Sequence, residues 1–167
     1  MSRHRFGAIE RLAFDIDAEP DEHLQGVAFL ALWAGGTRLG ATDRTEVLST
    51  FLASLARFVD ALPAAPQELA ALSSAAAFEA VHALATASDP GRPDFPWDRS
   101  ASYRRLLLLP NDCAPFDGEW AIVLREPARD RVIVRPYDDP SVRDVVLGAG
   151  EVEAAARAVM RHPWLDR

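Results

Sequence analysis

The order of the strand-like and helix-like segments limits the possible folds of this chain more than any other feature. Strand patterns occur in two runs, one before the first helical segment and one after the second, at residues 6–17, 26–33, 38–40, 103–109, 119–125, 131–137 and 142–147. Successive strands joined by short turns favour an antiparallel sheet, because parallel strands need long crossover connections. We therefore expect an α+β fold, in which a mainly antiparallel sheet of five to six strands carries about three helices on one face.

The clearest helical pattern follows Asp43, which together with Glu46 three residues later resembles a capping box. Apolar residues then repeat at helical spacing as far as Leu62. A second helical segment covers about 69–87, and a third covers 151–161. These three segments are the helices that we expect to cover the sheet.

Length and composition indicate one soluble domain that spans residues 1–167. A net charge of -7 argues against a nucleic-acid partner, because the neutralisation of phosphates requires a basic surface. All 18 basic residues are Arg, so chemistry that needs a Lys amine is excluded. The one Cys cannot form an internal disulfide, and no apolar run is long enough to span a membrane. We expect a cytoplasmic protein that has neither a membrane nor a nucleic-acid partner.

The stretch FDIDAEPDE, at residues 14–22, raises the question of chemistry most directly. On a strand, Asp15 and Asp17 lie on the same face, so their carboxylates could hold one divalent cation, as in a metal-dependent hydrolase or phosphotransferase. The phosphatase pattern that starts with Asp-x-Asp also needs a downstream Lys, which this chain lacks. The other interpretations are a solvated strand end that enters an acidic turn, and a surface that meets a cationic partner.

Other features indicate recognition rather than catalysis. The proline-rich residues 88–102 predict a long ordered loop, in which Phe95 and Trp97 could anchor a protein partner, although Trp97 could equally pack back over the helices. Two acidic groups could steer a basic partner, or could be ordinary charged turns. The candidate partner-binding residues are therefore Phe95, Trp97, Asp15, Asp17, Glu19, Asp21, Glu22, Asp138, Asp139 and Asp144. The sequence predicts no catalytic residue, no metal ligand and no cofactor, since its four histidines are scattered and no nucleophile motif is present.

Several segments together resemble a family of bacterial immunity proteins. These are the strand FGAIE, the strand pair FLALWAGGTRLG before a helix, the strands DGEWAIVL and DRVIVRP, and the stretch VVLGAGEVEAAARAV before a Trp-Leu end. They are similar to the family known as immunity protein 42, from polymorphic-toxin systems. The resemblance implies a small intracellular α+β protein that binds and neutralises a cognate toxin domain without performing chemistry. The loop DPGRPDFPW and the Ala-rich second helix depart from the family pattern.

The resemblance transfers no catalytic residue and no toxin-contact position. The partner that it implies is a cognate toxin domain, and the negative charge of the chain favours a basic one. Two alternatives stay open at this point: the metal-dependent enzyme centred on Asp15 and Asp17, and an accessory protein of a secretion system. The sequence does not predict the oligomeric state.

Overall fold

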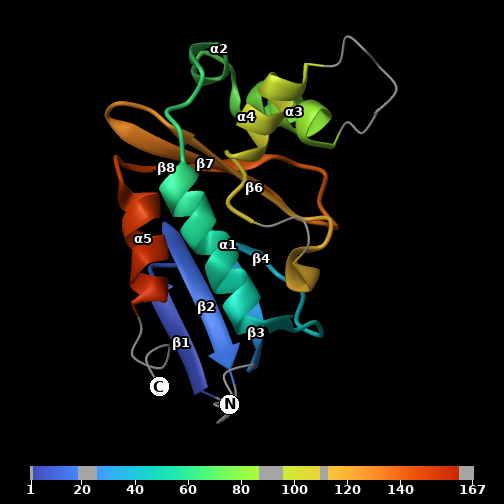
Figure 1. Cartoon of the computed structure of the whole chain (residues 1–167), viewed down its shortest axis with the longest axis vertical. Coiled ribbons are helices and arrows are strands. Elements are labelled where there is room, and N and C mark those ends of the chain that lie inside the picture. Colours follow the sequence, from blue (N-terminus) through green and yellow to red (C-terminus); the bar gives the residue numbers. More distant parts are fainter. Residues whose placement is uncertain (1, 19–25, 87–95, 110–112, 162–167) are drawn as a thin grey trace.

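A computed structural model describes residues 2–18, 26–86, 96–109 and 113–161. The described residues form an α+β fold, as predicted, but their strands make two antiparallel sheets instead of one (Figure 1). The first sheet has the order β1-β2-β3-β4, with β5 also paired to β3, and the second has the order β6-β7-β8. The strands are β1 (Ser2–Gly7), β2 (Leu12–Ala18), β3 (Val27–Ala34), β4 (Thr37–Leu39), β5 (Glu46–Val47), β6 (Trp120–Arg125), β7 (Arg129–Arg135) and β8 (Arg143–Gly148).

Two tight hairpins build most of the first sheet. The segment 6–17, predicted as one strand, is in fact β1 and β2 joined by a short turn. Gly7 makes this turn possible, because it has a φ of 107° and a Cβ there would lie 2.1 Å from the Leu12 carbonyl oxygen. The hairpin between β3 and β4 turns at Gly35 and Gly36, both with positive φ, as the sequence predicts.

The helices begin and end at other residues than predicted. In the described part of the chain they are α1 (Leu48–Ala61), α2 (Gln67–Ala70), α3 (Ser74–Thr86), α4 (Trp97–Arg104), α5 (Glu151–Met160) and the 3-10 helix η1 (Ala114–Phe116). The capping box at Asp43 is wrong: Val47 is the N-cap of α1 and makes no side-chain cap bond. Glu46 lies in β5, and its carboxylate accepts hydrogen bonds from the backbone N–H groups of Val47 (2.8 Å) and Ala114 (3.2 Å).

The region predicted as a long loop and a strand contains a helix. Helix α4 starts directly after Pro96 and covers the end of the predicted loop 88–102 together with the start of the predicted strand 103–109. The Ser100 hydroxyl donates to the Leu84 carbonyl oxygen (2.9 Å), which ties α4 to α3. Only an isolated antiparallel bridge between Leu107 and Ile122 remains of the predicted strand.

The second sheet is buried on both faces, which corrects the prediction that helices cover one face only. Ala121, Val123 and Val132 belong to the core that the first sheet shares with α1 and α5. Ile122 and Ile133 belong to a second core, with residues of α2, α3 and α4. In Figure 1, α1 and α5 lie over the first sheet, whereas α2, α3 and α4 lie at the other side of the second sheet. The second sheet therefore joins the two cores.

Among the described helices, none is long and apolar enough to cross a membrane.

Candidate functional site

The carboxylate of Asp15 is buried in an ion-pair cluster on the face of the first sheet that points away from α1. Its side chain accepts hydrogen bonds from Arg3 Nη2 (2.6 Å), from Arg5 Nε (2.6 Å) and Nη2 (2.8 Å), and from Trp33 Nε1 (3.0 Å). The cross-strand register explains the contact, because Asp15 pairs with Arg5 in β1. The hydrogen bond from Arg5, assisted by Arg3 and Trp33, holds the pKa of Asp15 well below its usual range.

The contact of Asp15 with a partner stays a prediction, and the structure shows how its charge is compensated within the chain. Asp15 is only 4% exposed, and the guanidinium groups of Arg3 and Arg5 balance its charge. It therefore adds no uncompensated charge to an acidic rim. Asp17 lies on the same face, is partly exposed, and has Arg3 and Phe29 as its cross-strand neighbours. Within the ranges that the structure describes, no three His, Cys, Asp or Glu side chains come together in a way that could hold a metal ion.

The other predicted partner-binding residues belong to several different elements or lie outside the described residues. Glu19, Asp21, Glu22 and Phe95 lie outside the described residues. Trp97 is 51% exposed and is the first residue of α4, and Asp144 is exposed on β8. Asp138 and Asp139 follow β7, where the Asp139 carboxylate accepts hydrogen bonds from the Ser141 backbone and hydroxyl and pairs with Arg143. The contact of these residues with a partner stays a prediction.

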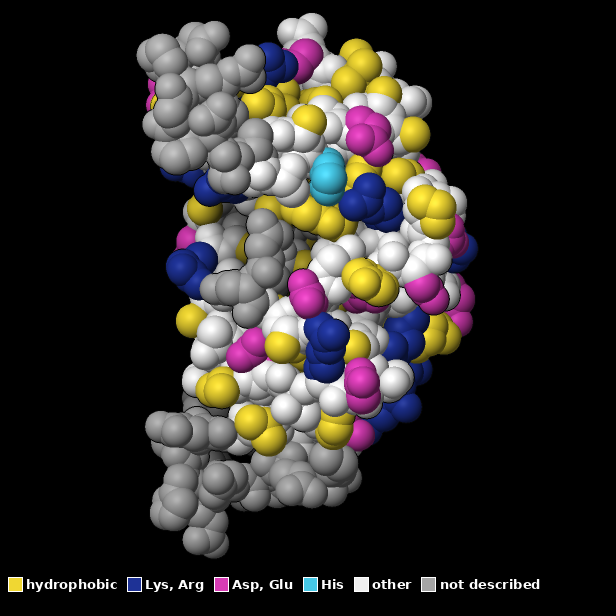
Figure 2. Space-filling model, turned by 90° about the vertical axis from the view of Figure 1, so that its right-hand side faces the viewer, with side chains coloured by type: hydrophobic (Ala, Val, Ile, Leu, Met, Phe, Trp, Pro, Cys, Tyr) yellow, Lys and Arg dark blue, Asp and Glu magenta, His cyan; other side chains and the backbone are white. Residues whose placement is uncertain are grey.

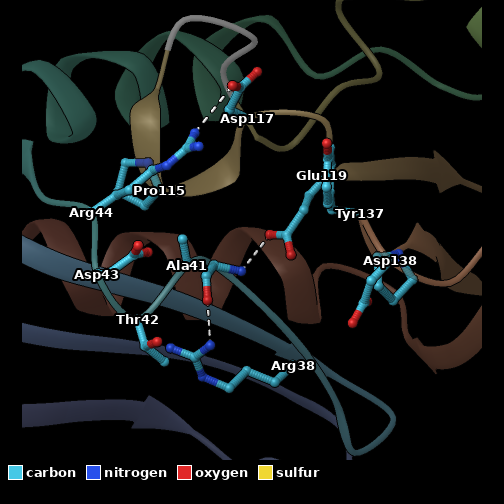
Figure 3. A pocket seen from close by; sticks show the side chains of 12 residues that line it. Arg38, Ala41, Thr42, Asp43, Arg44, Pro115, Asp117, Glu119, Tyr137 and Asp138 are labelled. Carbon is cyan, nitrogen blue, oxygen red and sulfur yellow. Dashed lines mark hydrogen bonds and ion pairs between the residues drawn. The ribbon is translucent and has the colours of Figure 1, made fainter.

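A pocket of about 440 Å³ brings together three segments that are far apart in the sequence (Figure 3). Residues 38–44 include the end of β4 and the turn after it, residues 115–119 run from η1 to the residue before β6, and residues 136–138 follow β7. The first two segments are tied by a backbone hydrogen bond from Ala41 N to Pro115 O (2.7 Å) and by an ion pair between Arg44 and Asp117 (3.1 Å). The walls of the pocket are therefore held by contacts between segments.

Glu119 points into the pocket, and its carboxylate accepts a hydrogen bond from the Gly40 backbone N–H (Figure 3). Arg38 donates to the carbonyl oxygen of the same glycine. Burial raises the pKa of the Glu119 carboxyl, although the Gly40 N–H and the charge of Arg38 favour its ionised form. In the part of the chain that the structure describes, no Arg or His side chain forms an ion pair with Glu119.

Tyr137 forms one edge of the pocket and is 77% exposed, more than any other large hydrophobic residue in the described part of the chain. Its ring lies against Gly118, where a Cβ would come within 2.4 Å of the ring. Gly118 also has a φ of 77°, a conformation that residues with a side chain rarely adopt. The glycine thus provides both the turn and the space that the tyrosine ring occupies.

The charges around the pocket favour a cation. Four carboxylates line it, from Asp43, Asp117, Glu119 and Asp138, against two guanidinium groups, from Arg38 and Arg44. The side of the molecule that carries η1 and the turn after β7 shows acidic and Arg side chains close to one another, with hydrophobic side chains among them (Figure 2). Among the described residues, no His, Cys or Ser lines the pocket.

Sequence reasoning identified Asp138 but missed Glu119, Arg38 and Tyr137. One signal was available for Glu119, which directly precedes β6 and is in alternation with Ala121 and Val123. A charged residue at the end of an apolar alternation must be exposed to water or have a polar partner. No sequence signal connects residues 38–44 with 136–138, because the contact depends on the packing of one sheet beside the other.

Comparisons with known proteins give one informative match. No protein-family model matches the chain, and no curated protein matches it in sequence. The structure is similar to the crystal structure of CdiI from Burkholderia dolosa, with a TM-score of 0.71 and 18% sequence identity. The match covers 94% of this chain and 98% of the other one. The two proteins therefore share one fold over nearly their whole length.

Proposed function

We propose that this protein is an immunity protein, which binds a cognate toxin domain and thereby neutralises it. The observation that carries the proposal is the fold that it shares with CdiI, an immunity protein of contact-dependent growth inhibition, over 94% of this chain and 98% of that one. The resemblance of the sequence to immunity protein 42 supports the same class of protein, and membership of that particular family stays a prediction.

The chemistry of the described residues supports a binding role. Their pocket has an exposed aromatic ring, a residue type that is enriched at protein interfaces, and a surplus of carboxylates that complements a basic partner. The net charge of -7 favours a basic toxin surface through faster association. We further propose that neutralisation takes place in the cytoplasm and needs no reaction catalysed by the immunity protein itself.

The metal-dependent enzyme centred on Asp15 and Asp17 gains no support from the geometry. A divalent cation needs oxygen ligands that are free to approach it, whereas both Asp15 oxygens accept hydrogen bonds from Arg5. Arg3 and Trp33 add to the same cluster. No observation favours an accessory role in a secretion system.

The experiment is a protection assay against each candidate toxin domain that the genes beside this one encode. Bacteria that express that domain should stop growing, and co-expression of this protein should restore growth. A toxin domain from an unrelated system serves as the control, and this protein should give no protection against it. Unrestored growth at equal expression of a folded protein would contradict the proposed function.

A further inference from the structure

We propose that the pocket between residues 38–44, 115–119 and 136–138 receives an arginine side chain of the toxin domain, which pairs with Glu119 and packs on Tyr137. This inference rests on the proposed function and names the chemistry of the contact. It concerns the pocket in Figure 3, where Glu119 faces the cavity and Tyr137 lies close to it.

The first argument is the charge balance inside the pocket. Arg44 pairs with Asp117, and this leaves Arg38 as the other cation against three carboxylates, those of Asp43, Glu119 and Asp138. Opposite charges at a protein interface favour a matching partner and disfavour one of the same sign. The negative charge that remains in the pocket therefore favours the binding of a cationic group.

The second argument is the cost of keeping Glu119 charged. The carboxylate is half-buried and, among the described residues, has no ion-pair partner. Burial of a charge destabilises the folded state unless an opposite charge compensates it, and burial raises the pKa of this carboxyl although the Gly40 N–H and the charge of Arg38 favour its ionised form. A guanidinium group of the toxin domain would pair with Glu119. Binding would thereby offset the unfavourable free energy of burying this charge.

The third argument is the position of Tyr137. Aromatic rings with few rotatable bonds are frequent anchors of protein interfaces, and this ring is already seated against Gly118. A guanidinium is planar, stacks on aromatic faces and pairs with a carboxylate through two hydrogen bonds. Arginine therefore fits a site made of one carboxylate and one ring better than lysine does.

The test compares two variants with the same chemical change. Glu119→Gln removes the charge and keeps an oxygen that can accept the Gly40 N–H, and Glu79→Gln removes an exposed charge on α3, away from the pocket. Each variant is titrated with the purified toxin domain encoded beside this gene. We expect Glu119→Gln to weaken binding about 30-fold, mainly through faster dissociation, and Glu79→Gln to stay within about twofold of wild type.

Folding stability separates a binding role from a structural one. Because burial raises the pKa of Glu119 above its unfolded value, ionisation of this carboxyl makes a net unfavourable contribution to folding at pH values above both its unfolded and its folded pKa. Glu119→Gln should therefore unfold at the same urea concentration as wild type or at a higher one, although it binds less tightly. A variant that loses binding only because it is less folded would overturn the proposal.

A double-mutant cycle identifies the partner residue. The surface arginines and lysines of the toxin domain are replaced by Gln one at a time, and each variant is titrated with wild type and with Glu119→Gln. One arginine replacement should weaken binding to wild type about 30-fold and leave binding to Glu119→Gln nearly unchanged. If Glu119→Gln binds as tightly as wild type, or if it couples to a lysine instead, the arginine site is wrong while the proposed function stands. If the wild-type protein itself does not bind the toxin domain, the result contradicts the proposed function and not only the arginine site.

Discussion

Replacement of Asp15 by Asn should destabilise the protein by about 2 kcal/mol at pH 7. The carboxylate accepts charged hydrogen bonds from Arg3 and Arg5 at 2.6–2.8 Å, and removal of a partner from an enclosed ion pair costs about 3–5 kcal/mol. The side chains of Arg3 and Arg5 are 60% and 40% exposed, so water can hydrate them once the negative charge is gone. This exposure lowers the expected cost to about 2 kcal/mol.

The stability difference between wild type and Asp15→Asn should depend on pH in a defined direction. The pKa of Asp15 is lower in the folded state than in the unfolded state, chiefly because of Arg5, so its stabilising contribution is complete above the unfolded value of about 3.9. Below that value, wild type loses up to about 1.4 kcal/mol per pH unit relative to the variant. The gap between wild type and Asp15→Asn should therefore narrow as the pH falls below about 4.

Urea unfolding, followed by tryptophan fluorescence at pH 7 and at pH 3.5, measures both effects. Asp144→Asn is the matched control, since Asp144 is exposed on β8, and it should change the free energy of unfolding by less than about 0.5 kcal/mol. A loss below about 0.5 kcal/mol for Asp15→Asn, or a gap that does not change with pH, would refute the account of this cluster. A rise in wild-type stability with added Mg²⁺ that Asp15→Asn abolishes would restore the metal interpretation.

Three further substitutions test the fold and the pocket by urea unfolding. Phe78→Ala should cost about 3–5 kcal/mol, because Phe78 is fully buried in the second core, and a small loss would mean that α3 is not packed on the second sheet. Asp130→Ala should cost about 2 kcal/mol and increase amide exchange in α5, since the buried carboxylate accepts the N–H groups of Gly150 (3.0 Å) and Val152 (3.3 Å). Gly118→Ala should cost about 1–3 kcal/mol through its positive φ and displace the ring at the pocket edge, and an unchanged tyrosine NMR spectrum would argue against that contact.

The sequence was sufficient for the fold class and for most of the strands. Alternation and turn glycines correctly predicted β3, β4, β6 and the hairpin at residues 35–36, because these signals depend only on neighbouring residues. The division into two sheets could not be predicted in this way. Ile122 and Val123 are equally apolar, and only the packing of α2, α3 and α4 places one in the second core and the other in the first.

Local competition explains the wrong predictions around the helices. Glu46 has the spacing of a capping residue, but its carboxylate binds the backbone at Val47 and Ala114 instead. Pro96 was interpreted as part of a loop. A proline is nevertheless compatible with the start of a helix, because the backbone N–H that it lacks would have no partner within the helix at that position. Helix α4 starts at the next residue, Trp97, which the sequence placed inside the loop.

The candidate site was only partly accessible to sequence reasoning. Asp138 was predicted as a partner-binding residue and lines the pocket, and its contact with a partner stays a prediction. Asp15 was also predicted, but Arg3 and Arg5 lie opposite or diagonal to it in the neighbouring strand and balance its charge. Glu119 was missed, since its importance depends on burial between segments that only the folded chain brings together.

The most direct test of the central claim is calorimetric titration of this protein with the purified toxin domain encoded beside it. A folded protein with a specific recognition surface should form a stoichiometric complex with a Kd in the nanomolar range or tighter, and the toxin activity should fall in proportion to the complex formed. Absence of binding at micromolar concentrations, with the toxin fully active in the same mixture, would contradict the claim that this chain is an immunity protein.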